Sequence, residues 1–174
     1  GLVEISTEGV NVTLKSGSII YNVVGVSGDQ YPNIPELRND ITFYVQESVL
    51  KSMIRQTFHA IATTDIKPVH MGSKFHIENN VLSVVSVDGV RMAKRVEPVT
   101  YNDIDFVVPA KTLGELMRML SEEADENKKV AICIDRSQIC ISKDDYMIIS
   151  RLLEGNFIDY DRIMNFDEKF SATV

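Results

Sequence analysis

The chain of 174 residues lacks long apolar runs, and that absence narrows what it can be. No stretch approaches the roughly 18 consecutive apolar residues that a membrane-spanning helix needs. The opening GLVEISTEGV has neither the basic nor the apolar segment of a signal peptide, although a mature secreted protein would share that absence. We therefore expect no membrane partner and a cytoplasmic location.

Cysteine is also scarce, with only Cys133 and Cys140 in the chain. The two lie in a β-rich stretch without CxxC spacing and without a histidine nearby. A disulfide needs an oxidising compartment, and a metal site needs more ligands than two thiols. We therefore expect two buried thiols.

Motifs that carry chemistry are missing too. The chain contains no P-loop, GxGxxG, GxSxG or HExxH pattern, and His59, His70 and His76 stand apart from paired carboxylates. Asp88-Gly89 and Asp144-Asp145 are typical of turns between strands. We predict no catalytic residue, no metal and no cofactor, and hence a protein that is not an enzyme.

What is present is an apolar content of 44% and a net charge of -7. That apolar content supports a globular core, and the acidic balance excludes a polycation that coats nucleic acid. Any contact with DNA must come from local charge. The chain starts without Met in a strand-like segment, so we expect a piece of a longer protein.

An internal repeat organises the chain. Residues 43–55 align without a gap on residues 106–118, and Phe, Val, Leu and Arg recur in register at 43/106, 45/108, 50/113 and 55/118. Each segment is a short strand followed by a helix with apolar residues at i, i+3, i+4 and i+7. The first helix is predicted over 48–61 with Ser48 as its cap, and the second around 112–120.

Alternating strands follow each helix, at 74–77, 82–87 and 91–96, and again at 130–134, 138–141 and 146–153. The order in both copies is β-α-β-β-β. The pattern predicts an α+β fold with a pseudo-twofold repeat and two helices packed on antiparallel sheet.

A looser echo relates the segment before Phe43 to the segment before Phe170. It spans a whole domain, so we expect tandem domains. The predicted division is the C-terminal part of a first domain at 1–38, a complete central domain at 41–160, and a linker with the first strand of a third domain at 161–174.

Basic residues recur on the face of each helix opposite its apolar stripe. Lys51, Arg55 and His59 follow i, i+4, i+8 spacing on the first helix, and Lys111 and Arg118 lie on the second. An ordinary solvated helix face is one interpretation. A surface that contacts DNA phosphates without reading sequence is the other.

Five ordered stretches resemble one family: LKSMIRQT at 50–57, TTDIKPV at 63–69, VDGVRM at 87–92, VPAKTL at 108–113 and SRLLEGNF at 150–157. Together they resemble the central domain of the bacterial DNA sliding clamp, the beta subunit of the replicative polymerase. The resemblance implies the DNA-clamp fold, a homodimeric ring around double-stranded DNA, and DNA-facing roles for Lys51, Arg55, His59, Lys111 and Arg118. It also implies partners that carry a clamp-binding motif, namely the replicative polymerase, the clamp loader and repair proteins.

The same resemblance implies a pocket for the peptides of those partners. Its expected wall consists of His70, Val87, Gly89, Val90, Arg91, Met92, Ile158 and Ile163. His70 stands where the family usually has an aliphatic residue, Val90 where it has His, and Ile158 where it has Pro. We expect these departures to alter the specificity of the pocket and not its location.

A different class of function competes with the clamp. A stand-alone α+β domain that binds a small molecule, or an enzyme, would use its helices to cover a ligand cavity. Such a protein leaves the outward helix faces free to vary, whereas a clamp needs basic residues there in both repeats. The cations on both helices favour the clamp.

Overall fold

The computed structural model describes residues 1–33, 41–64 and 66–164, apart from the side chain of Ile163. The chain divides into two compact units, residues 1–36 and residues 37–174. In the part of the chain that is described, no helix has the length and apolar composition to cross a membrane.

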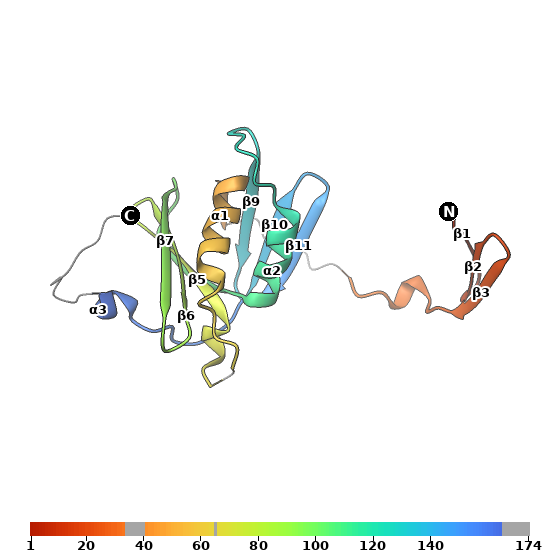
Figure 1. Cartoon of the computed structure of the whole chain (residues 1–174), viewed down its shortest axis with the longest axis horizontal. Coiled ribbons are helices and arrows are strands. Elements are labelled where there is room, and N and C mark those ends of the chain that lie inside the picture. The colour runs from red at the N-terminus through yellow and green to blue at the C-terminus, as the bar shows by residue number, and fades with distance from the viewer. Residues whose placement is uncertain (34–40, 65, 165–174) are drawn as a thin grey trace. The chain divides into compact units, whose positions relative to one another are not determined.

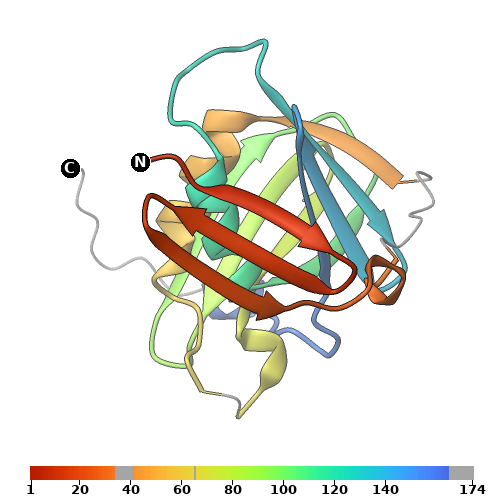
Figure 2. The same ribbon diagram turned by 90° about the vertical axis from the view of Figure 1, so that its right-hand side faces the viewer.

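The first unit is an antiparallel meander. It consists of β1 (Glu4–Glu8), β2 (Asn11–Ser16) and β3 (Ile19–Val24), followed by the 3₁₀ turn Gly28–Gln30. Figure 2 shows the three strands side by side. Its β1 and β3 residues are all exposed, including several large apolar side chains of β3. A three-stranded sheet alone buries no core of its own.

The second unit has two four-stranded antiparallel sheets and two main helices (Figure 1). One sheet has the order β11-β10-β9-β4 and the other the order β7-β6-β5-β8. The strands are β4 (Ile41–Gln46), β5 (Gly72–Glu78), β6 (Val81–Val87), β7 (Met92–Pro98), β8 (Ile104–Pro109), β9 (Lys129–Asp135), β10 (Gln138–Lys143) and β11 (Tyr146–Arg151). This confirms the predicted α+β class and the doubled β-α-β-β-β order.

The two halves exchange their first strands. β4 opens the first half but pairs with β9 of the second, and β8 opens the second half but pairs with β5 of the first. The registers match as well, since Ile41 lies opposite Ile134 and Ile104 lies opposite Ile77. The pseudo-twofold repeat of the sequence is thus a repeat of strand pairing.

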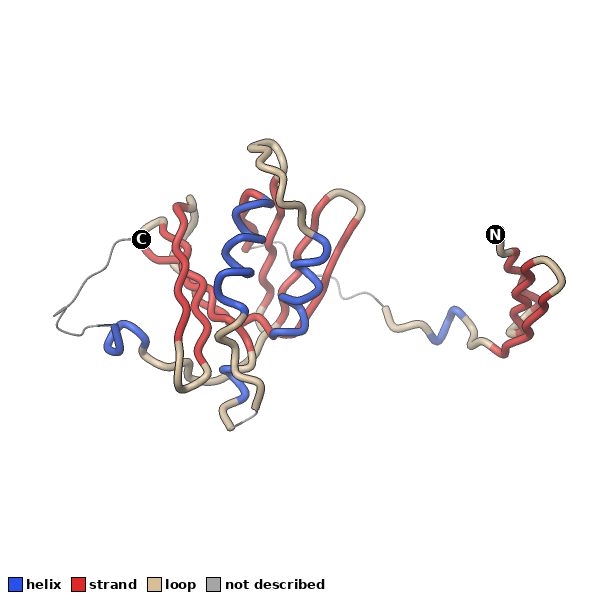
Figure 3. Tube along the Cα trace, in the orientation of Figure 1, coloured by secondary structure: helices blue, strands red, loops and turns tan. Residues whose placement is uncertain are grey.

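Helices α1 (Glu47–Phe58) and α2 (Ala110–Met119) contact each other and lie side by side against the strands (Figures 1 and 3). The predicted apolar stripes face inward, with Leu50, Met53 and Ile54 of α1 and Leu113 and Leu116 of α2 at most 1% exposed. Burial of these side chains is the main source of helix stability.

The predicted cap of α1 was wrong. The helix begins at Glu47 with Gln46 as its N-cap, and no side chain caps it, so Ser48 lies inside the first turn. The reason is that β4 runs directly into the helix, and the N–H of Glu47 donates to the carbonyl of Lys128 at 2.9 Å. The α-helix also ends at Phe58, and tighter i to i+3 hydrogen bonds continue the turn to Ile61.

The segment after β11 reaches the sheet that contains β5, β6, β7 and β8. The N–H of Leu153 donates to the carbonyl of Val107 at 2.9 Å, and the short helix α3 (Tyr160–Met164) follows. Lys94 of β7 lies 4.8 Å from the centre of the Tyr160 ring and 3.3 Å from the carboxylate of Asp161. The predicted linker at 161–174 therefore begins inside a helix, and the strand predicted after it lies outside the described residues.

Candidate functional site

The outward faces of α1 and α2 carry the predicted cationic residues. Arg55, His59, Lys111 and Arg118 are exposed, whereas the Lys51 side chain is only 19% exposed. Because the helices lie next to each other, four of the five residues gather on neighbouring helix faces. Their contact with DNA stays a prediction.

Lys51 is largely committed to the protein itself. Its ammonium group donates a 2.8 Å hydrogen bond to the carbonyl oxygen of Leu120, the C-terminal cap residue of α2. A cation at a helix C-terminus satisfies a free carbonyl and opposes the negative end of the helix dipole. Lys51 therefore ties α1 to the end of α2.

The two repeat-related arginines are each paired with a glutamate. Arg55 Nη1 lies 3.6 Å from Glu122 Oε1, and that same oxygen lies 3.6 Å from Lys51 Nζ. Arg118 Nη1 lies 2.6 Å from Glu115 on its own helix. The outward surface is therefore closer to charge balance than the count of cations implies.

Glu122 is held by a loop that is anchored on a buried carboxylate. Glu47 is 1% exposed, accepts the backbone N–H of Ser121, and lies 2.6 Å from Lys143 Nζ. Burial works to raise the pKa of Glu47, but the hydrogen bonds from Lys143 and Ser121, with the charges of Lys143 and Lys128, outweigh it and lower that pKa. The sequence signal for Glu47 was absent because its partners lie far away in the chain.

A second candidate site lies beside the β6–β7 turn. A cavity of about 270 Å³ is bounded by the loop after α1, the β6–β7 turn and the segment after β11. Its lining contains His70, Val87, Gly89 and Ile158 from the predicted pocket, together with Ala62, Thr64, Ile66, Lys67 and Asp88. The resemblance had pointed to the 63–69 stretch as a motif, so most of these additional residues had a signal.

The remaining predicted pocket residues are placed differently. Val90 is 91% exposed at the turn, and Arg91 and Met92 follow it without lining the cavity. Ile163 is in α3, and its side chain lies outside the described part of the structure. Whether these residues hold a peptide stays a prediction.

The β6–β7 turn is built by Asp88. One carboxylate oxygen accepts the N–H groups of Val90 and Arg91, both at 3.1 Å, and the other accepts from Arg91 Nε at 2.8 Å. The hydrogen bond from Arg91 is the main cause of the lowered pKa of Asp88. Gly89 has φ +92°, which L side chains rarely adopt. This confirms the turn role predicted for Asp88-Gly89.

Among the described residues that line this cavity, only His70 has a buried side-chain polar atom, Nε2, without a hydrogen-bond partner. The residue is 8% exposed, and its ring meets Phe157 edge-on at 5.1 Å. Burial, with a smaller effect of the Lys67 charge, lowers its pKa, so the ring is neutral near pH 7.

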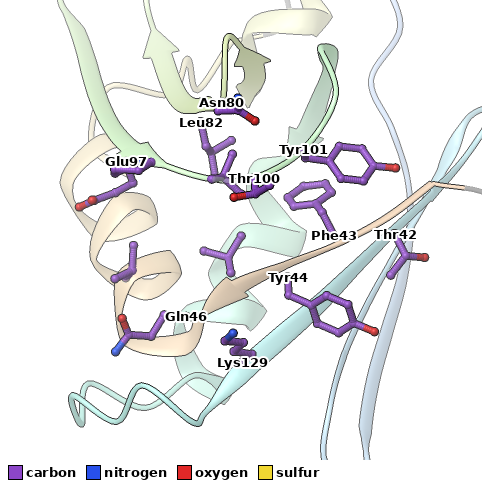
Figure 4. Close-up of a pocket in the computed structure, with 14 residues that line it drawn as sticks. Thr42, Phe43, Tyr44, Gln46, Asn80, Leu82, Glu97, Thr100, Tyr101 and Lys129 are labelled. Carbon is purple, nitrogen blue, oxygen red and sulfur yellow. The ribbon is translucent and has the colours of Figure 1, made fainter.

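A cavity of about 620 Å³ opens beside β4 and the β7–β8 connection (Figure 4). Phe43 and Tyr101 form its aromatic side, with ring centres 5.1 Å apart. Its carboxylate, Glu97, accepts a hydrogen bond from Arg95. The cavity contains none of the predicted site residues.

Among the described residues, no group of three or more His, Cys, Asp or Glu side chains is placed to hold a metal ion. Cys133 and Cys140 lie opposite each other on β9 and β10 and are buried thiols, as predicted. Burial raises the pKa of Cys140, and the neighbouring Cys133 adds to that shift. A thiol with a raised pKa is a poor nucleophile at neutral pH.

Comparison with known proteins gives a consistent result. The family model of the DNA polymerase III beta subunit, central domain, matches residues 44–159. A beta sliding clamp from Halalkalibacterium halodurans is 36% identical over 151 residues, which are 83% of this chain and 39% of that protein. The chain thus spans less than half the length of that relative.

Solved structures agree in fold. A Eubacterium rectale protein assigned as a DNA polymerase III beta subunit superposes with a TM-score of 0.84 at 31% identity, covering 95% of this chain and 46% of that one. The DNA polymerase sliding clamp of Bacillus subtilis gives 0.83 at 27% identity, covering 95% and 44%. The two-sheet, two-helix architecture is that of these clamps.

Proposed function

Because this chain belongs to the DNA polymerase III beta subunit family, we propose that it is part of a sliding clamp, a ring that encircles duplex DNA and tethers the replicative polymerase. Such a protein is a processivity factor and a non-catalytic subunit of the polymerase holoenzyme. The family match across residues 44–159 is the observation that carries the proposal. It favours the clamp over a stand-alone small-molecule-binding domain or enzyme.

DNA contact is assigned to the outward faces of α1 and α2. The exposed cations Arg55, Lys111 and Arg118, with exposed His59, support it, because they lie on neighbouring helices of an acidic chain. Contacts of this kind reach phosphates and carry no sequence information. Lys51 contributes charge from a half-buried position, since its ammonium group is hydrogen-bonded to the carbonyl at the end of α2.

Partner binding is assigned to the cavity beside the β6–β7 turn. The apolar side chains of Val87, Ile66 and Ile158 suit an apolar anchor of a short peptide, and Gly89 leaves the backbone of the turn accessible. The expected ligands are clamp-binding motifs of the polymerase, the clamp loader and repair proteins. In the longer protein, Arg91, Met92 and Ile163 would complete the wall.

The domain organisation supports a longer parent protein. The meander of residues 1–33 leaves Ile19, Ile20 and Tyr21 between 58% and 65% exposed, so we assign it to the end of a preceding domain that would cover them. We assign residues 41–160 to the central domain, and 161–174 to a linker with the first strand of a third. The proposed assembly is a cytoplasmic homodimeric ring.

Topological retention on DNA tests the proposal directly. The full-length protein is loaded on nicked circular DNA, and the circle is then cut once. A clamp stays on the closed circle and slides off the linear product, which is measured as protein co-eluting with DNA on gel filtration. Retention after cutting would contradict encirclement, and failure to load on the circle in the presence of its loader would contradict the clamp itself.

A further inference from the structure

The hollow on the outward face of α1 has the composition of an anion site. Ser48, Lys51, Ser52 and Arg55 line it, and Glu122 closes it from the loop after α2. Its volume is about 190 Å³. Two cations and two hydroxyl groups around one cavity can donate many hydrogen bonds to an oxyanion.

The present occupant of that hollow uses few of those donors. One oxygen of Glu122 sits 3.6 Å from both Lys51 Nζ and Arg55 Nη1, beyond hydrogen-bond distance. It balances their charge and makes no hydrogen bond to either. One N–H of Lys51 is used by the carbonyl of Leu120, and its other two N–H groups remain available with those of Arg55 Nη1. Ser52 Oγ accepts from Gln56 Nε2 at 3.2 Å, so its own hydroxyl hydrogen can be donated into the hollow.

The position of Glu122 is set by hydrogen bonds of the two residues that precede it. The preceding residue, Ser121, donates its N–H to buried Glu47, and the carbonyl of Leu120 is bound by Lys51. These two hydrogen bonds hold the start of the loop after α2 against α1. The carboxylate itself is 62% exposed, so it can swing into solvent without disturbing them.

We propose that this hollow is a phosphate seat and that Glu122 is its built-in competitor, displaced by a backbone phosphate of duplex DNA. The inference rests on the proposed function for its choice of DNA over other phosphate sources. A tetrahedral phosphate offers more acceptor oxygens than the distant Glu122 oxygen and can reach Lys51, Arg55 and the serine hydroxyls together. The competitor keeps the contact weak, as a sliding ring requires.

Helix α2 repeats only part of this arrangement. Arg118, which occupies the place of Arg55 in the second half, is also paired with a glutamate, Glu115. There the glutamate comes from the same helix and no lysine stands at the place of Lys51, which is Gly114. The seat with two cations is therefore confined to α1.

The test compares E122Q with E123Q, a control from the same loop with the same change in net charge. Glu123 binds Lys128 at 2.6 Å and does not line the hollow. The ¹⁵N-labelled chain is titrated with inorganic phosphate and, separately, with a short duplex at low salt. Backbone signals of Ser48 and Ser52 and the Nε signal of Arg55 report occupancy, and thermal melting checks that each variant is folded.

E122Q is expected to bind inorganic phosphate roughly two- to fivefold more tightly than the native chain, the range set by losing exposed ion pairs. E123Q should match the native chain. For the duplex, E122Q should also bind more tightly at low salt, because the phosphate no longer has to displace a carboxylate.

Equal phosphate affinity in E122Q and E123Q, or shifts away from Ser48, Ser52 and Arg55, would overturn the seat. Tighter phosphate with unchanged duplex binding would overturn its assignment to DNA. Neither result bears on encirclement, which the linearisation experiment measures separately. A chain that fails there can still show the seat.

Discussion

Phe43 and Phe106 occupy the same place in the two halves of the chain, and their rings meet in the core with centres 6.4 Å apart. Phe106 also stacks on Phe75 at 5.4 Å, across the β5–β8 pairing. The repeat axis thus passes through a shared aromatic cluster. Each half completes the core of the other.

Removing either ring should therefore cost much of the stability of the domain. We expect F43A and F106A each to lower the free energy of unfolding by about 3–5 kcal/mol, the range for buried Phe to Ala. The double variant should lose less than the sum, because the two rings share one contact. Urea denaturation followed by circular dichroism measures both.

The exposed neighbour Tyr44 supplies the control for the aromatic cluster. Its side chain is 62% exposed, so Y44A should change stability by no more than about 0.5 kcal/mol. Strict additivity of F43A and F106A would show that the two halves do not share a core.

Two glycines should respond in opposite directions to alanine. A Cβ on Gly72 would lie 2.2 Å from the carbonyl oxygen of Val108, where β5 approaches β8, so G72A should destabilise by about 1–3 kcal/mol. A Cβ on Gly114 in α2 meets nothing within 4 Å, so G114A should stabilise by about 0.5–1 kcal/mol. Thermal melting of G72A and G114A measures both changes in stability. Equal changes in the two variants would contradict the close approach of β5 to β8.

The buried pair of Glu47 and Lys143 should make stability depend on acid pH. Since the folded pKa of Glu47 lies below its ordinary 4.5, its contribution is present above that value and is lost as pH falls through the folded pKa. In E47Q this part of the acid loss should disappear. Urea midpoints between pH 6 and 3 measure it.

Breaking the pair from the other side should be worse than removing both charges. K143M leaves the Glu47 carboxylate buried without its partner and should cost about 3–5 kcal/mol near pH 7. The double variant E47Q/K143M should recover part of that loss. If the double variant were as unstable as the sum of the single variants, Glu47 and Lys143 would not be coupled.

His70 should produce a second pH dependence, at higher pH. Its folded pKa is below the ordinary 6.5, so protonation favours the unfolded chain as pH falls below that value. Stability should decline by at most about 1.4 kcal/mol per pH unit until the folded pKa is reached. Denaturation midpoints from pH 7.5 to 5 should show this slope in the native chain and a flatter one in H70L.

The matched control changes a histidine that is exposed. H59Q should keep the native slope, because His59 lies on the outward face of α1 and is not buried. A native slope in H70L as well would assign the titration to other groups.

Local patterns predicted the local structure well. The apolar stripes of both helices and the turns at Asp88-Gly89 and Asp144-Asp145 follow from residue spacing and turn chemistry, and the structure confirms them. The exchange of β4 and β8 between sheets was not predicted, since pairing across such a distance leaves no mark within either segment. The cavity beside Gly89 contains His70, Val87 and Ile158, which the family resemblance had suggested, and its role as a peptide pocket stays a prediction.

Charge partners were the least predictable feature. Spacing on α1 identified Lys51 and Arg55, but the glutamate that faces them comes from a loop after α2, and Lys51 binds a carbonyl in that region. Helical periodicity says which residues share a face and nothing about which distant loop covers it. The same limit hid Glu47, whose partners are Ser121 and Lys143.

The strand exchange also governs how the domain can be made. Strand β4 cannot pair until β9 has been synthesised, because Ile41 lies opposite Ile134. At ribosomal rates, the time between the synthesis of these two residues is roughly 5 to 20 seconds. During this interval the nascent first half carries an unpaired strand and half of an aromatic cluster. The two-sheet unit therefore folds only after β9 has been synthesised, and stalling or truncation before β9 releases a chain prone to aggregate.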